Sequence, residues 1–502
     1  MRFTVANPGP KVAAMAALAG AAIWLLTHEY VGLGGDGTLY TFMALNRATR
    51  GLFDTDLFLR YGSQDAYSIF SPIYGALIAA VGVLKANITL LVVAHLLWLT
   101  GAWLLTHRLL RGLVGHLAFL LVCAMPLTYG GASFLAAGEP FLTSRPFAEA
   151  FVLIALARLL SRAWITAAIA LALAAAFHPL VALAGLGAAV VALAIRRPVW
   201  LWAAPVGAAL LLGAAFVHVE PFSRALVTMD DAWFGAVKRY NSFVLITTWT
   251  GVDWARAVCA VTPCAVAALW TRGLRRGVFA GAAVVCALAL PITLIGGDVA
   301  RDALIVQLQL WRTGWLCTVI QLPALVVIWL RLRRRPMGRL IAALAAAPSL
   351  MLTLVFEDAA WAPALIISLL GLVMAVLAKT RRLPSLDPGW ERRCLIAIAI
   401  LPAANIVIQA ALMGWLTIFA IKLGLVLPNE PNFLPARLAL LAGAWTLTRR
   451  SPRQFSAGLA AVAVVFIAGA LTWDERSPWE RFVVAGRPPS LAATVPAGAA
   501  LL

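Results

Sequence analysis

Apolar stretches of about 17–22 residues recur along almost the whole chain, and this repetition restricts the folds available to it. A hydrocarbon core roughly 30 Å thick is crossed by about 20 apolar helical residues. Of the 502 residues, 63% are hydrophobic and only 12% are charged, with a mean hydropathy of +0.91. These values exclude a soluble protein and predict an all-α polytopic transmembrane helix bundle.

Basic residues occur as short clusters between the apolar stretches. In a soluble domain the net charge of +19 would suggest a nucleic-acid partner. In a membrane protein the positive-inside rule accounts for the same clusters, because cytoplasmic loops are enriched in Lys and Arg. We therefore expect membrane lipids and no nucleic acid as partners, and a multi-pass protein of the inner (plasma) membrane.

The clusters also predict the topology. If all are cytoplasmic, an even number of crossings must separate successive clusters. Segment 66–84 breaks this rule unless it lies in the membrane interface, and its sequence YSIFSPIYG suits that position. About 13–15 spans then follow, with 414–427 as an interfacial or re-entrant piece. The expected spans are 11–27, 88–106, 113–128, 146–160, 164–177, 179–195, 199–217, 256–271, 277–296, 313–330, 340–355, 360–378, 394–413, 434–448 and 454–472.

This topology divides the chain into a transmembrane domain, 1–472, and an outer tail, 473–502. The N-terminus is expected in the cytoplasm. The first outer loop, 28–87, and most ionisable residues outside the basic clusters then face the periplasm or the exterior, so any chemistry is expected there.

The first outer loop is rich in carboxylates. Asp36 lies in a Gly-Gly-Asp-Gly turn before an expected interfacial helix, 38–50, and is a candidate catalytic base. The alternative is a simple helix cap. Asp54 and Asp56 alternate in LFDTDLF and could bind an acceptor or a metal, although a solvated turn explains them equally well. Asp65 is expected to cap the 66–84 helix.

Cationic side chains on the same face are candidate ligands of a phosphate. Arg145 ends the second outer loop, His178 lies in the turn between two spans, and Arg312 begins a span from the outside. Arg239 lies in the aromatic and basic loop 218–255. Each has a structural alternative: a lone His more often stabilises a fold than binds a ligand.

The remaining acids complete the candidate site. Glu139 and Asp230 join Asp54 and Asp56 as candidates for a second acid or for acceptor binding. Glu149 lies one turn inside an expected span, where a carboxylate is costly. No motif for nucleotide binding, and no Cys or His spacing typical of a zinc site, is present. We expect no metal ligands and no cofactor. A divalent cation such as Mg²⁺ or Mn²⁺ is compatible with the acids but is not implied.

The segment GGDGTLYTFMALNRATRGLF resembles the first outer loop of the GT-C superfamily of integral-membrane glycosyltransferases. SRPFAEAFVLIALARLL and AAFHPLVALAGL are also similar to stretches of those bundles. The resemblance covers the layout of about residues 1–330 and rests on short motifs. It places Asp36 at the position of the catalytic acid, although Gly37 stands where a second acid is frequent.

The resemblance implies transfer of a sugar from a polyprenyl-phosphate donor to a glycan, lipid or protein acceptor. Asp36 would act as general base, and cations would stabilise the departing phosphate. Two alternatives are a transporter or flippase of a lipid-linked or anionic envelope precursor, and a non-enzymatic assembly subunit. Acids gathered on one face, without an internal repeat, favour the enzyme over a transporter.

Overall fold

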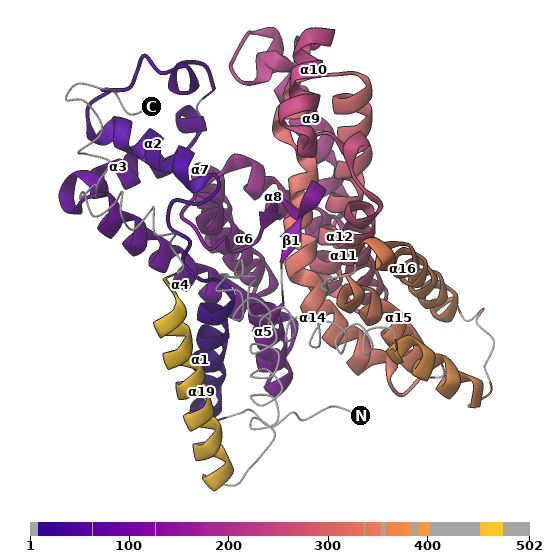
Figure 1. Ribbon diagram of the computed structural model, residues 1–502. Helices are drawn as coiled ribbons and strands as arrows, with labels where there is room; N and C mark the ends of the chain where they lie inside the picture. The colour runs from indigo at the N-terminus through magenta and orange to yellow at the C-terminus, as the bar shows by residue number, and fades with distance from the viewer. Residues whose placement is uncertain are drawn as a thin grey trace.

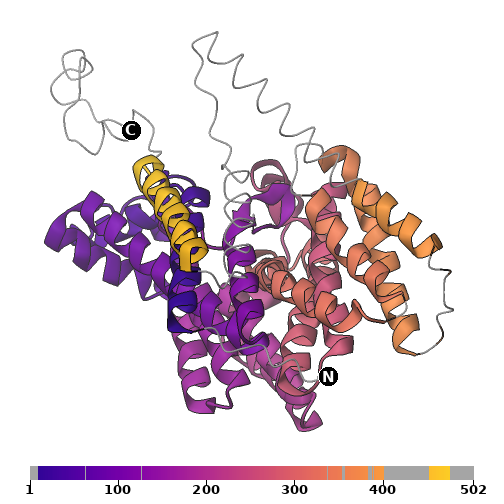
Figure 2. The ribbon, with the colours of Figure 1, turned by 90° about the horizontal axis from the view of Figure 1, so that it is seen from below.

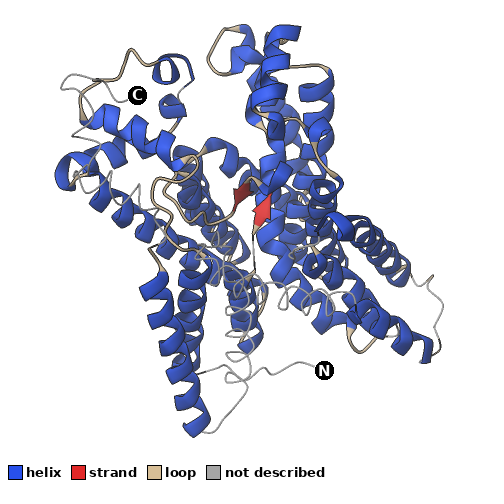
Figure 3. Cartoon of the chain, in the orientation of Figure 1, coloured by secondary structure: helices blue, strands red, loops and turns tan. Residues whose placement is uncertain are grey.

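The computed structural model describes residues 9–474, except 63, 126, 336, 353–356, 381, 383–386, 388 and 401–451. Within these ranges the chain is predominantly helical, and a single two-stranded sheet lies near its centre (Figure 3). The predicted all-α membrane bundle is therefore confirmed as a fold class.

The helices follow one another with short connections (Figure 1). The first half of the chain forms α1 (Pro10–Thr27), α2 (Gly37–Ala48), α3 (Phe70–Val81), α4 (Val83–Leu109), α5 (Leu113–Ala124), α6 (Arg145–Leu160), α7 (Trp164–Phe177), α8 (Pro179–Ala194), α9 (Ala203–Phe216) and α10 (Asp231–Tyr240). The second half forms α11 (Gly251–Trp270), α12 (Gly273–Ile292), α13 (Ala303–Leu308), α14 (Gly314–Leu332), α15 (Gly338–Met351), α16 (Glu357–Lys379) and α19 (Pro452–Thr472). Strands β1 (Thr128–Tyr129) and β2 (Leu135–Ala136) pair antiparallel between α5 and α6.

The expected spans correspond closely to these helices, and 164–177 coincides with α7. Seven helices within the described ranges are long and apolar enough to cross a membrane. They begin at Pro10, Val83, Pro198, Gly251, Gly273, Ala303 and Ala360. Shorter apolar helices include α3, α5, α7 and α8. A multi-pass membrane protein is thus supported. The expected pieces at 414–427 and 434–448, and 401–413 of another span, lie outside the described residues.

The segment predicted to lie in the interface forms α3, which ends at Gly82 before α4 begins. With 12 residues, α3 is roughly 18 Å long, shorter than a hydrocarbon core of about 30 Å. Its residues Phe70 and Tyr74 are fully buried in a small core shared with α2. One prediction here is wrong: Ile69 precedes α3, whereas Asp65 lies in an earlier 3₁₀ turn, Gln64–Tyr67. The helix starts later than its hydrophobic pattern suggests.

Helices α1 and α19 lie side by side although they come from opposite ends of the sequence (Figures 1 and 2). The ring of Trp473, just after α19, stacks on Tyr30, just after α1, with centroids 5.0 Å apart. The backbone N–H of Tyr30 donates to the carbonyl of Trp473 at 2.5 Å. The start of the tail therefore lies beside the start of the first loop, as expected if both face the same side.

Helices α6, α7 and α8 form a consecutive antiparallel set that packs against α4 and α12. Close approach depends on small residues: an added Cβ at Gly101 of α4 would meet the carbonyl oxygen of Ala150 in α6 at 2.8 Å. Because α7 returns the chain, α6 and α8 both begin at the end of the bundle where the second loop lies. This arrangement brings Arg145 and His178 to one end.

Candidate functional site

The central feature of the candidate site is a buried arginine between two carboxylates. Nη1 of Arg145 lies 2.7 Å from Oδ2 of Asp36, and Nη2 lies 2.7 Å from Oε1 of Glu139. Nε also donates to Oε2 of Glu139 at 3.0 Å. Arg145 and Glu139 are each 2% exposed, whereas Asp36 is 28% exposed. Asp36 is therefore the member of the group that a ligand can reach.

Asp36 does not act as a helix cap. It occupies the N-cap position of α2, but its side chain accepts no hydrogen bond from the helix. In the residues described, no hydrogen bond to Oδ1 is found either, so one oxygen faces Arg145 and the other is free to accept. The alternative interpretation of Asp36 as a simple helix cap is therefore wrong.

The glycines beside Asp36 allow the first loop to approach the second. Gly35 has a φ of +52°, and a Cβ there would meet the ring of Phe141 at 2.9 Å. A Cβ at Gly37 would lie 3.3 Å from the carbonyl oxygen of Leu142. A side chain at Gly35 would be strained in this left-handed region and would push Phe141 away. The Gly-Gly-Asp-Gly turn thus places Asp36 against the loop that carries Arg145.

A second group of polar residues holds the backbone beside Glu139. Oε2 of Glu149 accepts from Gly138 N–H and from Trp98 Nε1, both at 2.9 Å. A ring nitrogen of His95 lies 2.9 Å from the carbonyl oxygen of Glu139. Glu149 is completely buried, and its two hydrogen bonds offset part of the cost of a carboxylate one turn inside an apolar helix. These residues support the loop and do not reach Asp36 themselves.

Arg312 is a buried cation without a carboxylate partner among the residues described. It is 6% exposed, and its Nε donates to Gln309 at 2.9 Å. Arg312 is close enough to Arg145 and Asp36 for their charges to act on it. A buried guanidinium is stable only when its charge is compensated. This arrangement favours an anionic ligand near Arg312.

His178 caps α8 and has one unused ring nitrogen. Its Nδ1 accepts from Val181 N–H at 3.4 Å, so the neutral ring carries its proton on Nε2. Within the described ranges Nε2 has no hydrogen-bond partner, and the side chain is 4% exposed. Burial lowers the pKa of His178 well below its usual value, and the charges of Arg312 and Arg145 lower it further. His178 is therefore a neutral donor close to both arginines.

Two tyrosines near the arginines were not identified from the sequence. Burial raises the pKa of Tyr129 well above its usual value, and neighbouring acids Glu149 and Glu139 raise it further. Its hydroxyl has no hydrogen-bond partner among the described residues. Tyr40 of α2 is also buried, and burial raises its pKa, while the charge of Arg145 opposes this shift. Both phenols are thus neutral donors.

The hairpin places Tyr129 beside Arg312. Gly130 follows β1 with a φ of +84° and packs against the indole of Trp311, where any Cβ would clash. The indole Nε1 of Trp311 donates to the carbonyl of Val244 at 3.2 Å. Trp311, which precedes Arg312, is thereby fixed against Gly130, which follows Tyr129. The Tyr-Gly-Gly run in the second loop was the only sequence signal for this contact.

The other candidate residues have local roles. Asp54 accepts from Asn46 at 2.8 Å, and Asp56 accepts from Phe58 N–H at 2.8 Å. Both are exposed, which agrees with the solvated-turn alternative. Asp230 caps α10 by accepting from Trp233 N–H at 2.7 Å. Arg239 is exposed in the last turn of α10, and no contact among the described residues joins it to Arg145 or Arg312.

The structure therefore unites Asp36, Glu139, Arg145, His178 and Arg312 and separates them from Asp54, Asp56, Asp230 and Arg239. Within the described ranges, no group of three or more His, Cys, Asp or Glu side chains is arranged to hold a metal ion. Comparisons with protein-family models, with curated proteins and with solved structures found no match to this chain. Its function must be inferred from the site itself.

Proposed function

We propose that this protein is a membrane glycosyltransferase of the GT-C type, which moves a sugar from a polyprenyl-phosphate donor to an acceptor hydroxyl at one face of the membrane. Asp36 is the general base. Arg312, His178 and Tyr129 bind the phosphate of the donor. The inner membrane is the proposed location, with the site facing the periplasm or the exterior.

The observation that carries this proposal is a group of buried donors without a carboxylate partner beside a reachable carboxylate. Arg312, Nε2 of His178 and the hydroxyl of Tyr129 can all donate, and none has a carboxylate acceptor within the described ranges. Leaving a buried donor unpaired costs about 1–3 kcal/mol, and more when it is charged. One phosphate group offers enough acceptor oxygens for all three.

Arg145 has a different role from the one first expected. It was a candidate phosphate ligand, but its guanidinium contacts Glu139 and Asp36. To bind a phosphate, Arg145 would have to release these two carboxylates. We therefore assign Arg145 to positioning. It orients Oδ2 of Asp36 and leaves Oδ1 toward the acceptor.

The reaction follows from these roles. The acceptor hydroxyl gives its proton to Oδ1 of Asp36 while its oxygen bonds to the anomeric carbon. The bond from that carbon to the phosphate oxygen breaks, and the electron pair stays on the phosphate. Arg312 and the neutral donors stabilise the negative charge that develops there. Attack from the side opposite the phosphate inverts the anomeric configuration.

The test is sugar transfer by purified protein from a panel of radiolabelled polyprenyl-phosphate hexoses and pentoses. Asp36→Asn keeps the size of the side chain but removes its proton affinity, so turnover should fall about 100- to 10,000-fold. Asp56→Asn, an exposed acid of the same loop, is the matched control and should retain activity. Full activity of Asp36→Asn would refute the assignment. Movement of labelled lipid across proteoliposomes without covalent transfer would instead support the transporter.

A further inference from the structure

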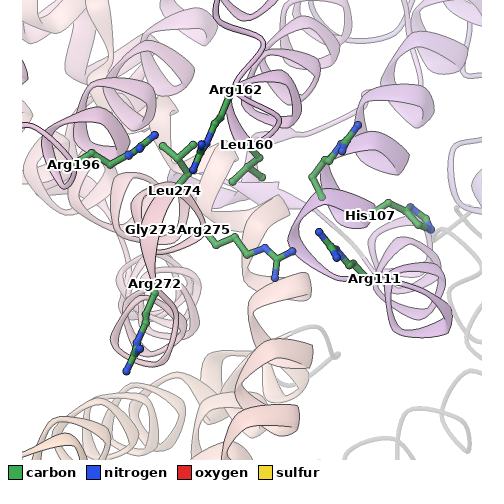
Figure 4. Close-up of a pocket in the computed structure, with 10 residues that line it drawn as sticks. His107, Arg111, Leu160, Arg162, Arg196, Arg272, Gly273, Leu274 and Arg275 are labelled. Carbon is green, nitrogen blue, oxygen red and sulfur yellow. The ribbon is translucent and has the colours of Figure 1, made fainter. Parts of the chain in front are cut away.

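A pocket lined by six arginines lies at the far ends of the same helices that carry the candidate site (Figure 4). Its volume is about 500 Å³, within the range of roughly 300–1,000 Å³ that is typical of ligand sites. The arginines are Arg108, Arg111, Arg162, Arg196, Arg272 and Arg275.

Helices α6 and α8 separate this pocket from the candidate site. Arg145 begins α6 and Leu160 ends it at the pocket; His178 precedes α8 and Arg196 follows it. Each helix has 16 residues and is roughly 24 Å long. The pocket is therefore a separate site at the other end of the bundle, and the inference below does not depend on the proposed function.

The arginines converge more than the positive-inside rule requires. That rule needs cations near the helix ends but not a common cavity. In Figure 4 the side chains of Arg162 and Arg196 converge, and those of Arg111 and Arg275 point toward each other, whereas Arg272 points away. Arg275 lies within electrostatic range of Arg111. No ion pair to a carboxylate is formed by these side chains within the described ranges.

The position of the pocket along the bundle indicates the source of its ligand. Trp164 follows Arg162 by two residues and is 43% exposed; Trp200 and Trp202, which follow Arg196, are 44% and 68% exposed. Exposed tryptophans in membrane proteins are enriched at the depth of the lipid headgroups. The arginines next to them are therefore at headgroup depth.

We propose that this pocket binds an anionic lipid headgroup that carries two phosphate groups. Several guanidinium groups around one cavity can form paired hydrogen bonds to phosphate oxygens, which a single surface arginine cannot match. A headgroup with one phosphate would leave part of the arginine charge uncompensated. Basic pockets between helix ends are suited to such multiply charged headgroups.

The experiment measures lipid retained by the full-length protein. Protein in nanodiscs of phosphatidylcholine mixed with cardiolipin, which has two phosphates, or with phosphatidylglycerol, which has one, is released and analysed by native mass spectrometry. The pocket variant is Arg162→Gln/Arg196→Gln/Arg275→Gln. The matched control, Arg158→Gln/Arg197→Gln/Arg276→Gln, removes three charges from the same helix ends but from residues that do not line the pocket.

We expect wild type and control to retain cardiolipin equally and in preference to phosphatidylglycerol, and the pocket variant to retain it at least about tenfold less, a change of about 1.4 kcal/mol. Equal retention by all three proteins would overturn the proposal. A parallel titration with inorganic pyrophosphate in zwitterionic lipid tests a soluble source. Pyrophosphate binding that is lost in the pocket variant, with lipid retention unchanged, would overturn the lipid headgroup as ligand. The single variant Arg196→Gln repeats the comparison with minimal disturbance of the fold.

Discussion

Asp36 and Arg145 are separated by 109 residues in the chain, and yet Oδ2 of Asp36 accepts a hydrogen bond from Nη1 of Arg145 at 2.7 Å. The pair connects the first loop, between α1 and α3, to the start of α6. Since Arg145 also binds the buried Glu139, it fixes the partly exposed carboxylate of Asp36 to the interior of the bundle. The site is therefore built on α6 rather than on a free loop.

Replacing Arg145 should destabilise the protein. In Arg145→Gln the charge of Glu139 remains buried without its partner, which typically costs about 3–5 kcal/mol. Thermal unfolding in detergent should show this loss, and the double variant Arg145→Gln/Glu139→Gln should recover part of it because the unpaired charge is gone. A double variant no more stable than Arg145→Gln would contradict the role assigned to Glu139.

Replacing Arg312 should weaken donor binding without loss of stability. Its charge has no carboxylate partner among the described residues, so Arg312→Gln removes an uncompensated buried cation. A hydrogen bond to a charged group contributes about 1.5–3 kcal/mol, which corresponds to roughly 10- to 150-fold in affinity for a polyprenyl phosphate. The control is Arg301→Gln, a half-exposed arginine paired with Asp231. Unchanged affinity in Arg312→Gln would exclude Arg312 as the phosphate ligand.

The stability of the protein should depend on the protonation of His178. Burial, and then the charges of Arg312 and Arg145, lower its pKa well below 6.5 in the folded protein. The unfolded chain keeps the ordinary value and takes up a proton as the pH falls below about 6.5, so unfolding becomes more favourable there. His178→Asn retains a capping side chain but cannot take up this proton. Between pH 7 and pH 5 the variant should lose less stability than wild type; an identical loss would show that His178 titrates normally.

Helix α4 should cross the membrane. Lys85 and Arg108 lie near its two ends, 23 residues and roughly 35 Å apart, which exceeds a hydrocarbon core of about 30 Å. Cysteines introduced at the two positions should react with a membrane-impermeant reagent from opposite sides. Labelling of both from one side would contradict the predicted topology, because α4 would then not cross the membrane.

The sequence was sufficient to predict most helices because each has its own apolar stretch. Expected spans 164–177 and 454–472 differ from α7 and α19 by at most two residues at either end. Helix α3 was predicted as an interfacial segment from its Ser, Pro and Tyr content. The first residue of α3 was not predicted correctly. Asp is a residue type that often caps helices, but Asp65 lies in a separate 3₁₀ turn.

The candidate site was predicted only in part, because its contacts depend on the packing of distant segments. The positions of Asp36, His178 and Arg312 at helix ends were visible in the sequence. That Arg145 binds Asp36 depends on how α2 packs against the second loop. Tyr129 carried no signal of its own, since a two-residue strand is too short to produce a pattern.

The length of α7 has a consequence for the surrounding bilayer. Its 14 residues extend roughly 21 Å, and Ile165 and Ile169 on its surface are 77% and 55% exposed. This is a hydrophobic mismatch of about 9 Å against an average hydrocarbon core. Lipid next to α7 is expected to thin to match it. A polyprenyl chain arriving along this face would then have its phosphate drawn inward, toward the depth at which His178 ends the helix.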